Sequence, residues 1–307
     1  MINVTNPNDS NAQSKPTTQS PSDMIESGLV LVAMPIGNAS DISIRALEVL
    51  ASADLVACED TRVSSKLFAI HGLNPCTLSY HEHNAASQRP KLINRMSKGE
   101  TVALVSDAGM PLISDPGYKL VTECLTANIP VTCAPGPSSV LVALALSGMP
   151  TDRFFFQGFL PSKQMGRCRI LSELTPIPGS LVIMESANRL TAMLRDSANI
   201  LGNRKAAVTR ELTKRFEEVR RGKLDELATH YEAVGPPKGE IIVVISPQTN
   251  DAARFSQEAL DTLLSQKLLS ASLRDAVDQA TIISGWARRD VYKRALRLNT
   301  DNTTDVL

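Results

Sequence analysis

Loops rich in glycine and proline follow three apolar segments of the chain. They are P-I-G-N at 35–38, the loop at 106–117 and P-G-P-S-S at 135–139. Glycine lets a backbone approach a ligand closely, and proline holds a loop in shape before the ligand arrives. If the apolar segments are strands of one open α/β sheet, the three loops lie at its carboxyl edge, where ligands of such sheets bind. They therefore predict one binding crevice, although each loop alone could simply turn the chain.

The loops do not have the sequence of a common phosphate-binding motif. The first is not G-x-G-x-x-G, and G-x-x-x-x-G-K-[ST] occurs nowhere in the chain. We therefore expect a ligand that is held by backbone groups and by one or two carboxylates such as Asp107. The competing interpretation of Asp107 is a turn or a helix cap.

Charged residues also follow the apolar run at 55–58, in the sequence E-D-T-R at 59–62. They could cap the next helix, or Arg62 could offer its planar guanidinium to a phosphate. His81 and His83 flank Glu82, but two imidazoles without a clear third ligand fall short of a zinc site. We predict no metal.

Apolar runs alternate with helical patterns in the first half of the chain, which is typical of an α/β domain with a largely parallel sheet. Strands are predicted at 29–34, 55–58, 102–105 and 129–133, and helices at 43–52, 61–70, 86–97, 118–127 and 138–147. Gly148-Met149-Pro150 interrupts the pattern, which indicates a domain boundary near Pro150.

A second alternation follows that boundary. Strands are predicted at 154–156, 181–185, 207–209 and 241–245, helices at 188–200 and 223–233, and a further helical segment at about 255–298. The predicted domains are a disordered polar tail at 1–26, α/β domains at 27–149 and 150–250, and a basic helical extension at 251–307.

Composition excludes several classes of protein. The 307 residues carry 32 basic and 32 acidic side chains, and 43% are hydrophobic, as in a globular protein. No apolar run approaches the ~20 residues that span a bilayer, so no membrane association is predicted. The five cysteines have no metal-binding spacing and fit free thiols in a reducing, cytoplasmic compartment.

Taken in order, the motifs of residues 28–246 resemble one family. They are P-I-G-N, E-D-T-R, S-D-A-G-M-P-L-I-S-D-P-G at 106–117, A-P-G-P-S-S at 134–139, R-F-F-F-Q-G-F-L-P at 153–161, R-E-L-T-K at 210–214 and K-G-E at 238–240. The chain is similar to the tetrapyrrole-methylase superfamily, the class III methyltransferases, and in particular to its branch that modifies ribosomal RNA.

The resemblance implies two α/β domains with a cleft for S-adenosylmethionine between them, plus a C-terminal helical extension. It implies 2′-O-methylation of the ribose of a decoding-centre cytidine in 16S rRNA, within the 30S subunit, by a homodimer. The implied cofactor-binding residues are Pro35, Gly37, Asp107, Gly109, Met110, Pro111, Asp115, Ser138, Ser139, Met184 and Glu185. Met34 and Met110 stand where the family usually has threonine, so any hydroxyl contact there is lost.

Matched motifs also supply the candidates for chemistry and for RNA contacts. Asp60, Glu211 and Lys214 are candidate catalytic residues because they are polar residues within those motifs. The residues expected to contact RNA are Arg62, Arg210, Arg288, Arg289, Lys293 and Arg294. Residues 204–223 hold eight Lys or Arg against three Glu, and residues 286–297 hold five against one Asp. One such stretch would be explained by a solvated helix face, but two stretches, with Lys163, Arg167 and Arg169 as a third group, favour a surface that follows phosphates.

Two other functions stay open on the sequence. Methylation of a tetrapyrrole would use the same fold and donor, but such enzymes resemble G-x-G-P-G-D in the first loop, which differs here. An RNA-binding module with a vestigial cleft would have no need of three intact loops. The Phe-rich segment at 154–159 is expected to be a core strand, with stacking on RNA bases as the alternative.

Overall fold

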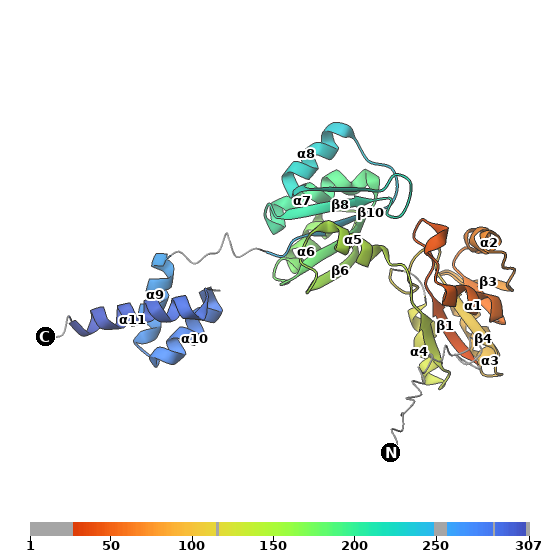
Figure 1. The fold of residues 1–307 in the computed structure, drawn as a ribbon, viewed down its shortest axis with the longest axis horizontal. Coiled ribbons are helices and arrows are strands. Elements are labelled where there is room, and N and C mark those ends of the chain that lie inside the picture. The colour runs from red at the N-terminus through yellow and green to blue at the C-terminus, as the bar shows by residue number, and fades with distance from the viewer. Residues whose placement is uncertain (1–26, 115–116, 249–256, 285, 305–307) are drawn as a thin grey trace, which may run out of the picture. The chain divides into compact units, whose positions relative to one another are not determined.

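The computed structural model describes residues 27–114, 117–248, 257–284 and 286–304 (Figure 1). The predicted tail at 1–26 and Asp115 lie outside these residues. The chain divides into two compact units, one of residues 1–146 with 209–218 and one of residues 147–208 with 219–307. The second unit begins at Ser147, three residues before Pro150, and the R-E-L-T-K motif belongs to the first unit.

The first unit contains a five-stranded sheet of order β3-β2-β4-β1-β5. Its strands are β1 (Gly28–Val32), β2 (Leu55–Cys58), β3 (Thr77–Ser79), β4 (Thr101–Val105) and β5 (Val131–Ala134). All four pairings are parallel, with Leu29 of β1 aligned to Val102 of β4 and to Val131 of β5. The carboxyl ends of all five strands therefore meet at one edge.

Helices cover both faces of this sheet because successive strand residues point to opposite sides. Leu29 and Leu31 pack in one apolar cluster, and Val30 and Val32 pack in the other. The helices of the unit are η2 (Ala39–Asp41), α1 (Ile44–Ser52), α2 (Thr61–Ile70), α3 (Ala85–Met96), α4 (Tyr118–Thr126) and α5 (Ser139–Ser147). Residues of α1 and α2 join the second cluster, and residues of α3 and α4 join the first.

The second unit contains a five-stranded sheet of order β6-β7-β10-β8-β9. Its strands are β6 (Phe154–Phe159), β7 (Ser180–Glu185), β8 (Lys205–Arg210), β9 (Glu218–Lys223) and β10 (Ile241–Ile245). Strand β6 pairs with β7 in parallel, whereas β10 pairs with β7 in antiparallel orientation. The sheet is therefore mixed.

One large apolar cluster holds the helices of the second unit against its sheet. The helices are α6 (Gln164–Leu174), η3 (Ala187–Arg189), α7 (Leu190–Leu201) and α8 (Leu224–Val234). Leu181 and Ile183 of β7 and Val243 of β10 are fully buried in this cluster, together with Leu190 and Leu194 of α7.

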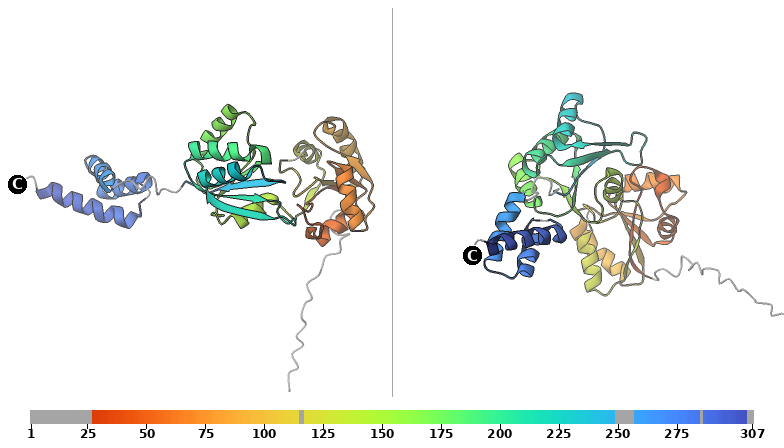
Figure 2. Two further views of the ribbon diagram at one scale, coloured as in Figure 1. Left: turned by 90° about the horizontal axis from the view of Figure 1, so that it is seen from above. Right: turned by 60° about the vertical axis from the view of Figure 1, so that its left-hand side comes forward.

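Three more helices, α9 (Gln257–Leu268), α10 (Leu273–Ser284) and α11 (Arg288–Thr304), pack against one another as a small bundle (Figure 2). Their shared core consists of Leu260, Leu264, Val277, Ala280, Val291 and Ala295. This bundle lies within the segment that the sequence predicts as a basic helical extension.

The Phe-rich segment differs in part from its prediction. It does form a strand, β6, but at one edge of its sheet, where Phe154, Phe155 and Phe159 remain 42%, 41% and 58% exposed. An edge strand has a neighbour on one side only, so its large side chains are less completely covered than those of β7.

Candidate cofactor and substrate site

The loops after β1 and β4 are joined by two backbone hydrogen bonds at the carboxyl edge of the first sheet. The Met34 N–H donates to the Gly109 carbonyl at 2.8 Å, and the Gly109 N–H donates to the Met34 carbonyl at 3.0 Å. The bridge holds the P-I-G-N loop beside the S-D-A-G-M-P loop. Gly109 adopts a φ of 73°, a conformation that other residues rarely accept.

The loop after β5 joins the other two. A Cβ atom added to Gly109 would lie 3.4 Å from Ile36 Cγ2 and 3.8 Å from the Pro137 carbonyl oxygen. One added to Gly136 would lie 3.1 Å from Ala33 Cβ. The three loops therefore meet around small residues.

Side chains next to this junction have clear local roles. Ser138 precedes α5, and its Oγ accepts a hydrogen bond from the Leu141 N–H at 3.5 Å. Met110 packs partly against the first apolar cluster, with its sulfur 3.9 Å from Cys133 Sγ, and Pro111 is buried. Ser139 begins α5. Helix starts leave backbone N–H groups free to bind a ligand.

At the same edge of the sheet, the Asp107 carboxylate after β4 binds the backbone of the E-D-T-R segment after β2. The Asp60 N–H donates to Asp107 Oδ1 at 3.0 Å. Burial raises the pKa of Glu59 above its ordinary value, and the negative charge of Asp107 adds to that effect. Asp107 thus fixes the E-D-T-R segment after β2 to the loop after β4.

Asp60 caps α2 and binds Arg62. Its Oδ1 accepts the Arg62 backbone N–H at 2.8 Å, and its Oδ2 lies 2.6 Å from the Arg62 guanidinium. The hydrogen bonds from Arg62 lower the pKa of Asp60 to about 2. The Arg62 side chain is nevertheless 87% exposed, so part of its guanidinium faces solvent.

The R-E-L-T-K segment packs on the P-I-G-N loop. The Asn38 N–H donates to Thr213 Oγ1 at 3.2 Å, and a Cβ added to Gly37 would lie 2.4 Å from Lys214 Cγ. Only glycine fits at position 37 without a shift of its neighbours. The structure therefore brings together Gly37 and Lys214, two residues that the sequence could only assign separately.

This segment has an unusual backbone. Glu211 and Thr213 adopt φ values of 49° and 64°, although neither is glycine and Thr213 is β-branched. The turn is held by an ion pair of 2.9 Å from Lys214 Nζ to Glu211 Oε1 and by a hydrogen bond of 2.7 Å from the Thr213 N–H to Glu217. At its base, Arg210 pairs with Glu218 at 3.1 Å. Such strain concentrates at functional sites.

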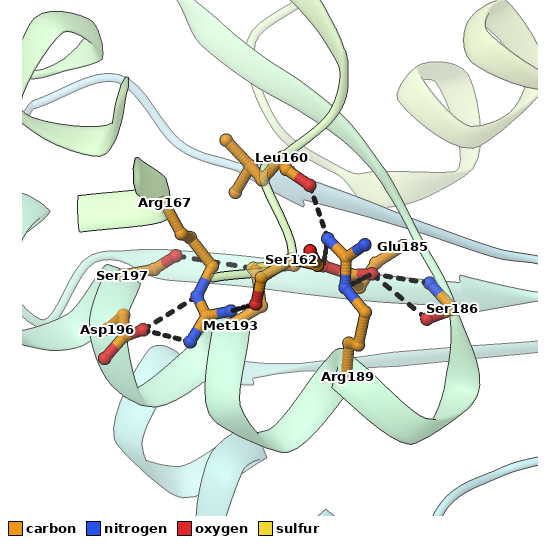
Figure 3. A network of polar contacts seen from close by, with 9 residues as sticks. All are labelled: Leu160, Ser162, Arg167, Glu185, Ser186, Arg189, Met193, Asp196 and Ser197. Atoms are coloured by element: carbon orange, nitrogen blue, oxygen red, sulfur yellow. Dashed lines mark hydrogen bonds and ion pairs between the residues drawn. The ribbon is translucent and has the colours of Figure 1, made fainter. Parts of the chain in front are cut away.

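In the second unit, Glu185 ends β7 with its side chain fully buried (Figure 3). Arg189 contacts Glu185 Oε1 at 3.0 Å and Oε2 at 3.1 Å, and it also donates to the Leu160 carbonyl after β6. The Ser186 N–H donates to the same carboxylate at 2.7 Å. Glu185 therefore fixes the ends of two strands, and Met184 beside it is half-buried.

A second buried pair supports the same region (Figure 3). Arg167 of α6 and Asp196 of α7 are only 6% and 7% exposed, with 2.6 Å between Arg167 Nη2 and Asp196 Oδ2. Arg167 also donates to the Ser162 carbonyl at 3.2 Å, and Gln164 donates to Asp196 Oδ1. The sequence places Arg167 on a surface that follows phosphates, and its burial against Asp196 contradicts that expectation. Arg189 and the pairing of Arg167 with Asp196 are not predicted; the one available signal is the i, i+4 spacing of Glu185 and Arg189.

The predicted RNA-contacting residues of α11 fall into two groups. Arg288 pairs with Asp278 at 2.7 Å, and Arg294 pairs with Asp261. Arg289 and Lys293 are exposed, and no ion pair involves them within the described part of the bundle.

The described residues hold neither a membrane span nor a metal-binding cluster. No helix among them is long and apolar enough to cross a membrane. No three His, Cys, Asp or Glu side chains there come together as a metal-binding group.

The fold is that of a two-domain α/β methyltransferase of class III. It combines a parallel sheet with Gly/Pro loops at its carboxyl edge, a mixed second sheet and C-terminal helices. The sequence model of the family described as Tetrapyrrole (Corrin/Porphyrin) Methylases matches residues 28–228. The chain belongs to this family, in the group of its relatives named ribosomal RNA small subunit methyltransferase I. S-adenosylmethionine is the methyl donor of this class of enzyme.

Two relatives of that name illustrate the match. The protein from Mesorhizobium japonicum is 46% identical over 282 residues, which cover 92% of this chain and 95% of the relative. The protein from Rickettsia prowazekii is 42% identical over 272 residues, which cover 88% and 96%. Among solved structures, the uroporphyrin-III C-methyltransferase of Thermus thermophilus with S-adenosylhomocysteine has a TM-score of 0.51 at 18% identity, covering 71% of this chain and 97% of that one. That likeness concerns the fold.

Proposed function

We propose that this chain transfers a methyl group from S-adenosylmethionine to the ribose 2′-hydroxyl of a decoding-centre cytidine in 16S rRNA, within the 30S subunit. The observation that carries the proposal is identity above 40% over nearly the whole chain to relatives named for the small-subunit ribosomal RNA. The motif resemblance supports the cytidine and the 2′-oxygen, and it supports action as a homodimer.

The proposed donor site is the carboxyl edge of the first sheet. Ligands of open α/β sheets bind beyond the carboxyl ends of the strands, and Gly109 and Gly136 keep the backbones of three loops close together there without side-chain bulk. The motif resemblance supports a part in donor binding for Pro35, Asp107, Met110, Pro111, Asp115, Ser138 and Ser139, and also for Met184 and Glu185. Both oxygens of Glu185 are engaged by Arg189, so we assign Glu185 a positioning role.

When bound, S-adenosylmethionine supplies an electrophilic methyl group on a sulfonium. The chain's own task is to hold the ribose hydroxyl in line with that carbon, since orientation can supply ~7–11 kcal/mol of a barrier. A proton acceptor would add roughly 10²–10⁴-fold. Asp60 suits that task poorly, because its bonds to Arg62 keep its pKa at about 2. Glu211 is likewise paired with a cation, Lys214, at 2.9 Å, so the proton acceptor is proposed from the motif resemblance and not from this geometry.

RNA binding is proposed to use exposed cations. Arg289 and Lys293 are exposed on α11, with no ion pair in the described part of the bundle, so these two suit phosphate contacts as they stand. Arg62 is 87% exposed but is paired with Asp60 at 2.6 Å, so a phosphate would have to share its guanidinium with that carboxylate. Arg210, Arg288 and Arg294 are paired with carboxylates, and a phosphate would have to share or replace those partners.

One experiment tests the function against its alternatives. The full chain is incubated with methyl-tritiated S-adenosylmethionine and one possible methyl acceptor at a time. The acceptors are unmethylated 30S subunits, free 16S rRNA and the tetrapyrrole uroporphyrinogen III. We expect label in the 30S subunit. Label in the tetrapyrrole alone would favour a small-molecule methylase, and RNA binding without label would favour a binding module; either result would overturn the proposal.

A further inference from the structure

An exposed aromatic side chain lies in the turn between β8 and β9. Phe216 is 64% exposed, a large apolar area for the tip of a loop. The guanidinium carbon of Arg215 lies 5.6 Å from the centre of the Phe216 ring, within the range of a cation–π contact. Arg215 covers part of the ring and leaves the remainder to solvent.

The turn that carries this pair is anchored at its base. The Asn38 N–H is bonded to Thr213, the Thr213 N–H to Glu217, and Lys214 to Glu211. Glu211 and Thr213 hold positive φ angles, which persist only where the surroundings determine the backbone. Phe216 is therefore presented by a turn of fixed conformation, three residues from the contact with the P-I-G-N loop.

The positive charge around Phe216 favours a negatively charged partner. Among the described residues, no carboxylate is paired with Arg215, and its side chain is exposed. The surrounding segment 204–223 carries eight Lys or Arg against three Glu. An exposed cation stacked on an exposed ring, in a basic segment, matches the way proteins bind unpaired nucleotides, with the base on an aromatic or guanidinium plane.

We infer that Arg215 and Phe216 form a stacking platform for an unpaired base of the RNA substrate, beside the nucleotide that is methylated. The inference rests on the proposed function and extends it, because it assigns substrate recognition to two residues outside the matched motifs. A contact with another protein chain would also cover Phe216, but it would not require the paired cation.

The test compares Phe216→Leu with wild type. Leucine keeps apolar volume and removes the planar ring, so we expect the affinity for unmethylated 30S subunits to fall roughly 5- to 100-fold in filter binding. The slope of log affinity against log salt should stay unchanged, because no charge is removed. Phe216→Trp should bind within about twofold of wild type, since it keeps a stacking plane.

Controls separate stacking from other causes. Phe154→Leu removes a 42% exposed aromatic from the amino end of β6 and should leave subunit binding unchanged. Affinity of Phe216→Leu for S-adenosylhomocysteine, measured by calorimetry, should equal that of wild type.

Three results would overturn the inference. Phe216→Leu could bind 30S subunits as tightly as wild type. It could change the oligomeric state in sedimentation, which would assign Phe216 to a protein contact. Wild type could transfer no methyl group to the subunits, in which case the proposed function fails and the platform with it; the first two results leave that function standing.

Discussion

Gly109 is the residue whose conformation bears most directly on the donor site. Its φ of 73° and its bonds to Met34 place it where three loops meet. Gly109→Leu would strain the backbone and fill the junction, so we expect S-adenosylmethionine affinity to fall about tenfold or more, measured by calorimetry.

Gly99→Leu is the matched control for this change. Gly99 has a φ of 93°, nothing within 4 Å of its Cβ position, and a place before β4 at the amino edge of the sheet. It should lose stability without losing affinity. A folded Gly109→Leu variant with wild-type affinity would refute the placement of the donor.

The Arg167–Asp196 pair is expected to stabilise the second unit. Asp196→Ala would leave the Arg167 guanidinium buried without its carboxylate, which typically costs about 3–5 kcal/mol. Arg195→Ala, one residue away on α7, removes only a half-exposed pair with Glu232 and should cost roughly 0–1 kcal/mol. Urea denaturation followed by circular dichroism measures both; equal losses would contradict this account.

Two buried thiols predict how stability depends on alkaline pH. Burial raises the pKa of both Cys58 and Cys124 to about 11 from an ordinary 9.0. The unfolded thiols lose their protons first as pH rises, so the free energy of unfolding should fall between about pH 9 and pH 11 and be unaffected below that range.

A comparison of variants isolates the thiols from other titrating groups. The double variant Cys58→Ala, Cys124→Ala should lose less unfolding free energy than wild type between about pH 9 and pH 11. Cys76→Ala, which removes an exposed thiol, should behave as wild type. Identical pH profiles for all three proteins would show that the buried thiols do not contribute to the pH dependence of the unfolding free energy.

At the scale of elements, the C-terminal bundle is expected to bind RNA through α11. Its apolar core includes Val291 and Ala295, so deletion of α11 would also expose α9 and α10. The double variant Arg289→Gln, Lys293→Gln is the cleaner change. Each lost phosphate contact should reduce the salt slope of 30S binding by roughly 0.7–0.9.

Lys98→Gln is the control for that charge change. Lys98 is exposed and lies between α3 and β4, at the amino edge of the first sheet. Its loss should leave the salt slope unchanged. If the α11 variant also keeps the wild-type slope, the bundle does not contact phosphates.

Elements with strong local patterns could be predicted from the sequence. The strand at 55–58 and the helix at 61–70 match β2 and α2 residue for residue. Four elements, β3, α6, β9 and the single-turn η2, are not predicted. Strand β3 is too short for a pattern, with only three residues. Strand β9 reads E-V-R-R-G-K and has no apolar alternation, so only its pairing within the sheet makes this segment a strand.

The site shows the same limit. The three Gly/Pro loops were visible because glycine and proline mark turns in any sequence. The positive φ angles of Glu211 and Thr213 leave no mark in residue type, and the contact of Gly37 with Lys214 joins positions far apart in the chain. Packing between segments that are distant in the sequence therefore determines this part of the site, and the motifs alone do not predict it.

At the scale of the whole molecule, two sheets and a helical bundle serve different parts of one proposed reaction. The first unit carries the Gly/Pro loops and the strained turn, the second buries Glu185 at a strand end, and the bundle exposes cations on α11. The relatives from Mesorhizobium japonicum and Rickettsia prowazekii, both named for ribosomal RNA, match 92% and 88% of the chain, so the likeness extends over all three parts. The proposed product of all three parts is one methyl group at a defined position of the ribosomal RNA.

Analysis of the nucleosides of the treated RNA locates that methyl group. Unmethylated 30S subunits are treated with the enzyme and S-adenosylmethionine, and their 16S rRNA is digested to nucleosides for mass spectrometry. We predict one new 2′-O-methylcytidine per subunit, within the decoding-centre fragment. A methyl group on a base, on another nucleoside, or on no RNA at all would contradict the account.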